Sequence, residues 1–215
     1  MTTVTLMGKA FQISGNLPKA GVVAFNFALV GTDLSDIRLS DFAGCSVIMN
    51  IFPSVETQVC AQSVRRVNEM AKKLDNTKVL CISKDLPFTH ERFNKSEGID
   101  KVISLSEFRN NHFGLAYGIV IEDGPFTGLF SRAVVALNPW HRVIYTQLVP
   151  EIGEEPDYDA LLDAMESITA CTVAETAAYP PTESGADEIC IKRHTTAHER
   201  LSTDDVCHYD RFKKI

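Results

Sequence analysis

The sequence predicts an α/β fold in which helices cover both faces of a mixed central sheet. Three observations predict it. Near-continuous apolar runs of strand length alternate along the chain with segments whose apolar residues recur at helical spacing. The last two strand-like segments flank a turn at residues 138–141, which indicates a closing hairpin and makes the sheet mixed. The 215 residues are 45% hydrophobic and 23% charged, enough apolar material for a buried core.

The individual elements follow from local pattern. Residues 4–13 predict an N-terminal β-hairpin, because apolar and polar residues alternate on both sides of a turn at Gly8-Lys9. Further strands are expected at residues 25–30, 46–52, 78–83, 101–105, 131–137 and 143–149. Helices are expected over residues 60–74, 87–93 and 107–117, with an irregular or helical connector over 34–42. Asp157 is a suitable N-cap for a last helix, in which one apolar stripe reaches Ile168.

The composition changes after Ile168. Residues 169–215 hold only seven of Val, Ile, Leu, Met, Phe and Trp, and they include Pro180-Pro181. Such a segment buries too little apolar surface to order itself. We therefore expect one domain at residues 1–168 and a weakly structured C-terminal extension at 169–215; a tail without a function of its own is the alternative.

Charge and hydropathy exclude several classes of function. The net charge of −7 argues against nucleic acid and anionic membranes as partners. No run of apolar residues is long enough to span a bilayer, and the first residues, MTTVTLMGKAFQISG, lack the continuous apolar core of a signal peptide. A cytoplasmic location is expected. In that reducing compartment a cysteine is more often a working thiol or a core residue than half of a disulfide.

The segment from Asn50 to Cys60 carries the chemistry. A buried strand ends, a loop begins with Pro53, and Cys60 opens the next helix. The first turn of a helix has unpaired N–H groups and a partial positive charge, which favour the thiolate form of a cysteine there. Thr57 lies three residues earlier, close enough to hydrogen-bond the sulfur or its substrate, and Pro53 can wall off the pocket without adding a competing N–H. The pattern predicts a nucleophilic thiolate.

The motif PSVETQVC resembles the peroxidatic signature of peroxiredoxins, and more narrowly that of the thiol peroxidases, an atypical two-cysteine branch. The resemblance extends over about residues 1–168. It includes LMGKAFQISGNLPKAG, LVGTDLSDIRLSDFAG, DNTKVLCISKDLPF, RAVVALN and QLVPEIGEEPDYDALLDA. It implies a thioredoxin-like fold and a thiol peroxidase that reduces hydrogen peroxide and organic hydroperoxides in antioxidant defence.

The same resemblance implies the roles of the site residues. Cys60 is the peroxidatic cysteine, which becomes a sulfenic acid when its thiolate attacks a peroxide oxygen. Thr57 and Pro53 match the active-loop positions of the family. Arg132 matches the active-site arginine, although the residues around it alone would indicate a surface charge. The family also implies electrons from thioredoxin or another thiol, a homodimer, and no metal, haem or flavin.

One position departs from the family pattern. The resolving cysteine that normally follows the DLPF motif is Asn94 here, and an amide cannot form a disulfide. An external thiol could reduce the sulfenic acid, or a cysteine of the extension could resolve it; the candidates are Cys171, Cys190 and Cys207. The alternative function is a redox-sensing or interaction protein with little turnover, because the resolving cysteine is missing.

The other cysteines and histidines are expected to have structural roles. Cys81 is predicted to be a core residue and Cys45 a small, partly buried one. In the extension, the spacing of two cysteines and two histidines departs from the standard patterns of structural zinc sites, so no metal site is predicted; the residues are Cys190, His194, His198 and Cys207. The remaining histidines are expected at the surface; they are His90, His112 and His141.

Overall fold

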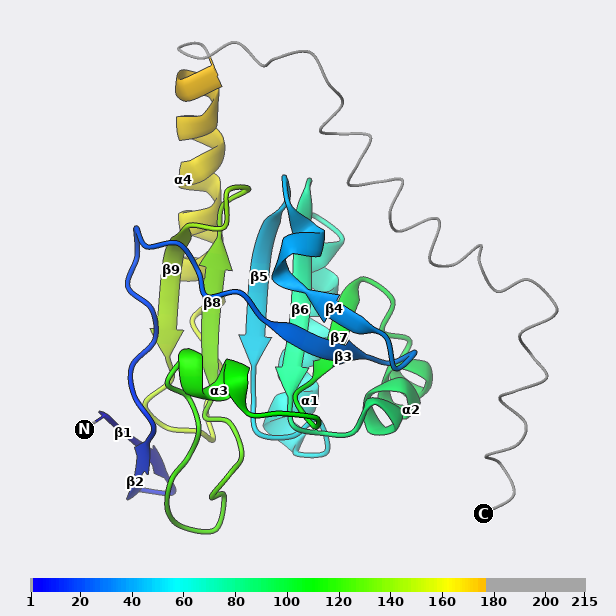
Figure 1. Cartoon of the computed structure of the whole chain (residues 1–215), viewed down its shortest axis with the longest axis vertical. Coiled ribbons are helices and arrows are strands. Elements are labelled where there is room, and N and C mark those ends of the chain that lie inside the picture. Colours follow the sequence, from blue (N-terminus) through cyan, green and yellow to red (C-terminus); the bar gives the residue numbers. More distant parts are fainter. Residues whose placement is uncertain (1, 177–215) are drawn as a thin grey trace, which may run out of the picture. The chain divides into compact units, whose positions relative to one another are not determined.

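The computed structural model describes residues 2–176, with the side chains described up to Ser167. Its main sheet has seven strands in the order β4-β3-β7-β6-β5-β8-β9 (Figure 1). The strands are β3 (Ala28–Gly31), β4 (Asp36–Arg38), β5 (Ser46–Ile51), β6 (Thr77–Ser83), β7 (Val102–Ser106), β8 (Ala133–Leu137) and β9 (Val143–Leu148). β5, β6 and β7 run parallel, and the other neighbouring pairs are antiparallel. The predicted mixed sheet is confirmed.

A separate two-stranded hairpin lies at the N-terminus, formed by β1 (Thr2–Leu6) and β2 (Lys9–Ile13). The helices are η1 (Leu39–Phe42), α1 (Gln58–Ala71), α2 (Pro87–Glu97), α3 (His112–Ala116) and α4 (Tyr158–Thr176). None of the helices described between residues 2 and 176 has the length and apolar content to cross a bilayer.

Strand alternation divides the core between the two faces of the sheet. Val47 and Met49 of β5 pack with Phe113 of α3 in one cluster, whereas Ile48 packs in a second cluster with residues of α1 and α4. Successive side chains of a strand point to opposite faces, so a strand that is apolar at every position must be covered on both. The near-continuous apolar run at residues 46–52 is explained by this double burial.

The parallel register places two loops side by side. Ile51, the last residue of β5, pairs with Ile82 of β6, so the loop before α1 and the loop before α2 both leave the carboxyl edge of the sheet. Sites in open α/β sheets form at this edge. The fold therefore places the Cys60 segment beside a second loop that can hold it.

Three local expectations were wrong. The hairpin turn lies at Met7 and Gly8, both with positive φ (51° and 75°), as a two-residue turn between twisted strands requires. The strand expected at residues 25–30 begins only at Ala28. The helix expected over residues 107–117 covers only His112–Ala116, because the backbone N–H of Glu107 still donates to Ser83 of β6 (3.0 Å) and continues the extended chain.

The last helix has the predicted N-cap, since Asp157 Oδ1 accepts a hydrogen bond from the backbone N–H of Ala160 (3.0 Å). The helix continues past Ile168, the expected domain boundary, to Thr176. The division into residues 1–168 and 169–215 stays a prediction, and residues 177–215 lie outside the described part of the chain.

The docking of α4 should be sensitive to its buried stripe. Leu161 is completely buried against the sheet face that also holds Cys60. Leu161→Ala should lower the free energy of unfolding by about 2–5 kcal/mol, because it leaves a cavity in a close-packed cluster. Chemical denaturation measures the change, and Asp163→Ala, at an exposed position of the same helix, serves as the control. Equal stability of the two variants would contradict the packing described.

Candidate active site

Cys60 lies in the first turn of α1, directly after the loop that leaves β5. Thr57 is the N-cap residue, with an extended backbone (φ −86°, ψ 145°), and its hydroxyl donates to the carbonyl of Ser54 (3.1 Å) rather than capping the helix. Cys60 is entirely buried. Its thiol therefore meets the positive end of the α1 dipole without competition from bulk water.

Arg132 supplies the second positive charge at this sulfur. It immediately precedes β8, and its Nη2 donates to Cys60 Sγ at 3.3 Å. Its Nε donates to the carbonyl of Ile152 (3.0 Å), and its Nη1 is buried without a hydrogen-bond partner among the described residues. A guanidinium that is only 1% exposed needs a negative partner. The contact places a buried positive charge directly beside the Cys60 sulfur.

The structure thus brings the predicted residues together from two chain segments. Pro53, Thr57 and Cys60 belong to one loop and the helix it starts. Arg132 immediately precedes β8, which pairs antiparallel with β5. Pro53 is buried within this loop. Arg132, which only the resemblance indicated, is the residue in hydrogen-bond contact with the thiol.

Asp85, which the sequence reasoning did not single out, holds the Cys60 loop. Its carboxylate accepts hydrogen bonds from the hydroxyl of Ser54 and the backbone N–H of Val55, both at 2.7 Å, and from the hydroxyl of Ser83 (2.8 Å). The three contacts join the loop before α1 to the end of β6. A polar residue two positions after the end of a buried parallel strand was the available signal.

His90 extends this network and is buried, so the expectation that it lies at the surface was wrong. Its Nε2 lies 3.0 Å from Ser83 Oγ, and its ring packs edge-on against Phe52. Burial lowers the pKa of His90 to about 4, against a smaller opposing effect of the Asp85 charge. His90 is therefore neutral at physiological pH. His112 is exposed as expected, and His141 is half-buried.

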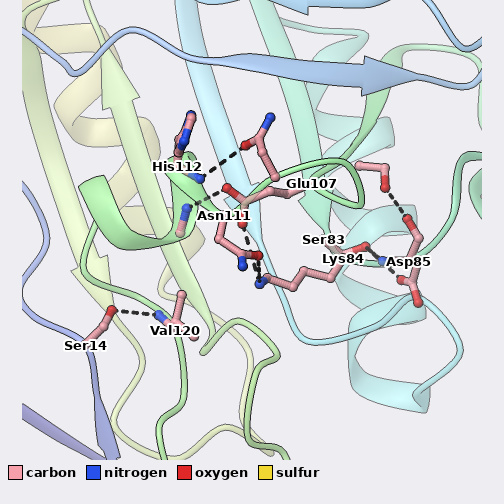
Figure 2. A network of polar contacts seen from close by, with 11 residues as sticks. Ser14, Ser83, Lys84, Asp85, Glu107, Asn111, His112 and Val120 are labelled. Atoms are coloured by element: carbon pink, nitrogen blue, oxygen red, sulfur yellow. Dashed lines mark hydrogen bonds and ion pairs between the residues drawn. The ribbon is translucent and has the colours of Figure 1, made fainter.

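A second polar network starts at the residue between Ser83 and Asp85 (Figure 2). Lys84 donates to Asn111 Oδ1 (2.9 Å) and lies 3.7 Å from Glu107 Oε2. Burial raises the pKa of Glu107, although its Oε1 accepts the backbone N–H of Gly114 (3.0 Å). These contacts tie the start of α3 to the carboxyl edge of the sheet.

Cys81 is poorly placed for chemistry. Cys81 is fully buried in β6, as predicted, and burial raises its pKa to about 12. Cys45 is fully buried, more than the partial burial expected. Asn94, at the family's resolving position, is half-buried on α2 and exchanges hydrogen bonds with Ser104 of β7 (3.0 and 3.2 Å). Its amide completes the packing of α2 on the sheet.

The remaining candidates fall outside the described side chains: Cys171, Cys190, His194, His198 and Cys207. Among the side chains that are described, no group of three or more His, Cys, Asp and Glu residues could hold a metal ion.

The sequence is similar to known proteins over the same residues that build this site. The Redoxin family model matches residues 17–162. A thiol peroxidase from Corynebacterium glutamicum is 48% identical over 165 residues, which span 77% of this chain and 99% of that protein. The chain belongs to the thiol peroxidases of the redoxin family.

Solved structures confirm the thioredoxin-like fold of this thiol peroxidase. A peroxiredoxin-like protein from Aquifex aeolicus is 32% identical, with a TM-score of 0.72 over 78% of this chain and 97% of that one. A thiol peroxidase from Chromobacterium violaceum has the same fold, with a TM-score of 0.73, 21% identity, and coverage of 78% and 97%. The chain is therefore an oxidoreductase of the peroxiredoxin type.

The buried His90 predicts a pH dependence of stability. Its folded pKa of about 4 lies below the ordinary value of 6.5, so between these values the unfolded chain binds a proton that the folded chain does not. The free energy of unfolding should then decrease as the pH falls through this window, by at most about 1.4 kcal/mol per pH unit from this residue. Urea denaturation at several pH values should show a shallower decrease for His90→Gln than for the wild type.

His112→Gln, at an exposed histidine, is the matched control for this experiment. A wild-type profile and a His90→Gln profile with the same slope between these pH values would contradict the buried, neutral state of His90.

Proposed function

We propose that this thiol peroxidase reduces hydrogen peroxide and organic hydroperoxides at Cys60, as a part of antioxidant defence. The observation that carries the proposal is the buried contact of 3.3 Å between Arg132 Nη2 and Cys60 Sγ. A cysteine that merely begins a helix needs no buried guanidinium beside it, whereas a nucleophilic thiolate gains from one.

The chemical step is a displacement at oxygen. The Cys60 thiolate attacks one peroxide oxygen, an S–O bond forms and the O–O bond breaks. Sulfur loses two electrons and becomes a sulfenic acid; the leaving hydroxide or alkoxide takes a proton and departs as water or an alcohol. Arg132 Nη1, buried and without a partner in the described structure, is a donor for the oxygen on which negative charge develops.

The loop residues orient the peroxide. In our proposal the Thr57 hydroxyl, now held by the Ser54 carbonyl at 3.1 Å, hydrogen-bonds the peroxide, and the first-turn N–H groups of α1 hold it in line for attack. Pro53 is buried in the same loop and carries no N–H that could compete for the substrate. These roles need only Pro53, Thr57 and the backbone of the first turn of α1.

The sulfenic acid needs a thiol from beyond the described side chains. Asn94 cannot form a disulfide, and the fully buried Cys81, with a pKa raised to about 12, is a poor nucleophile. Tyr158, at the start of α4, contacts α1 through a hydrogen bond from its hydroxyl to Ser63. Cys171 lies about 20 Å farther along α4 at the helical rise per residue. Cys171 is thus remote, along α4, from the residue that contacts α1.

We therefore propose an external thiol, such as thioredoxin, as the reductant. Its thiolate attacks Cys60 sulfur, releases water and leaves a mixed disulfide, which a second thiol then reduces. Residues 1–168 form the peroxidase domain in this proposal, and 169–215 are an extension of it. The protein works in the cytoplasm, as a homodimer. The exposed apolar side chains of Leu86 and Phe88 beside the Asp85 loop support an interface there.

Cys60→Ser should abolish peroxide consumption, because a hydroxyl at this position is not ionised at neutral pH and cannot form a sulfenic acid. Cys81→Ser is the matched control and should keep the wild-type rate within about twofold, since this buried thiol takes no part in the reaction. The measurement is the loss of hydrogen peroxide with excess dithiothreitol. Wild-type activity in Cys60→Ser would show that the site is elsewhere.

The source of the resolving thiol can be tested with a triple variant, Cys171→Ser, Cys190→Ser and Cys207→Ser. With thioredoxin, thioredoxin reductase and NADPH, this variant should turn over at a rate within about twofold of the wild type, because the external thiol attacks Cys60 directly. A variant that stops after one turnover would instead assign resolution to the extension. Arrest of the wild type itself after one turnover would favour a redox sensor.

A further inference from the structure

The carboxylate of Glu151 collects hydrogen bonds from the N-terminal hairpin. It accepts from the Thr5 hydroxyl (2.9 Å) and from the backbone N–H groups of Met7 (3.0 Å) and Gly8 (3.4 Å). Desolvation opposes the charge of Glu151, but these hydrogen bonds outweigh it and lower the pKa of this carboxyl. The arrangement is specific: both turn residues have positive φ, which directs two successive N–H groups toward one anion.

The backbone around Glu151 also pairs with β1. The Thr5 N–H donates to the carbonyl of Pro150 (2.6 Å), and the Ile152 N–H donates to the carbonyl of Thr5 (2.8 Å). Ile152 is buried in a small apolar cluster with Val4 and Ile13 of the hairpin. The position of residues 150–152 is therefore set by the hairpin, which is separate from the main sheet.

Ile152 connects these contacts between the hairpin and residues 150–152 to the reacting sulfur. Its carbonyl accepts the hydrogen bond from Arg132 Nε (3.0 Å), while the Nη2 of the same guanidinium donates to Cys60 Sγ (3.3 Å). A guanidinium is planar and rigid, so an acceptor at Nε sets the direction of both terminal nitrogens. A shift of Ile152 would turn Arg132 away from the thiol.

From these contacts we infer that Glu151 is a positioning residue for Arg132: by clamping the hairpin to residues 150–152, it fixes the carbonyl that orients the guanidinium toward Cys60. Glu151 touches neither the sulfur nor, in the proposed mechanism, the peroxide. The inference rests on the proposed role of Cys60 and assigns the N-terminal hairpin a part in that reaction.

Glu151→Ala should lower the second-order rate constant of Cys60 oxidation by hydrogen peroxide about tenfold, less than the hundredfold that a 1 Å misplacement of a reacting group can cost. Stopped-flow measurement of the first turnover gives this constant without the reduction step. Glu151→Gln keeps an acceptor oxygen for the turn and should recover most of the rate. Glu69→Ala, which removes an exposed, ion-paired carboxylate from α1, is the matched control and should leave the rate unchanged.

A second readout separates positioning from a general loss of stability. In nitrogen-15 NMR spectra, the Arg132 Nε–H should be protected from exchange with solvent in the wild type and in Glu69→Ala, and should lose protection in Glu151→Ala. If Glu151→Ala does not accumulate as folded protein, Thr5→Val replaces it. That variant removes the hydroxyl bonds to Glu151 and to Pro150 (3.1 Å) and should change both readouts in the same direction, by a smaller factor.

An unchanged rate together with an unchanged Nε–H signal in the folded variant would overturn the inference and leave the proposed function intact. A variant that melts at a lower temperature but keeps both readouts would also overturn it, because Glu151 would then be structural only. A wild-type Cys60 that does not react with peroxide would instead contradict the proposed function.

Discussion

The structure of this thiol peroxidase depends on one buried contact, between the guanidinium of Arg132 and the thiol of Cys60. Both groups are almost completely removed from water. A buried cation without a negative partner is costly, and so is a buried thiolate without a positive one. Each group therefore makes the burial of the other tolerable, and together with the first turn of α1 they define a dry, positively polarised site in which a small electrophile can react.

The two halves of this contact are held by independent parts of the fold. The Cys60 side depends on Asp85, whose carboxylate binds the loop before α1 to the end of β6. The Arg132 side depends on Ile152, which the N-terminal hairpin and Glu151 hold in place. The sheet brings the two sides together because β5 lies between β6 and β8. Loss of either support should misalign the pair without unfolding the domain.

How much of this arrangement could be predicted depends on how far apart in the sequence the contacting residues lie. The strand at residues 46–52 and Cys60 at a helix start follow from local pattern, and both were correct. Arg132 could not be assigned from its neighbours, because its partners Cys60 and Ile152 are remote in sequence; the family resemblance supplied it. Asp85, His90 and Glu151 were missed for the same reason. Each acts through contacts between segments far apart in the chain, and a single sequence contains no periodicity that reports such contacts.

The most direct test of the account is to add one equivalent of hydrogen peroxide to the reduced protein, trap sulfenic acid with dimedone and locate the adduct by mass spectrometry. The account predicts that the adduct forms on Cys60, with Cys81 unmodified because burial raises the pKa of its thiol to about 12. An adduct on another cysteine, or peroxide that persists while Cys60 stays reduced, would contradict the assignment of Cys60 as the peroxidatic residue.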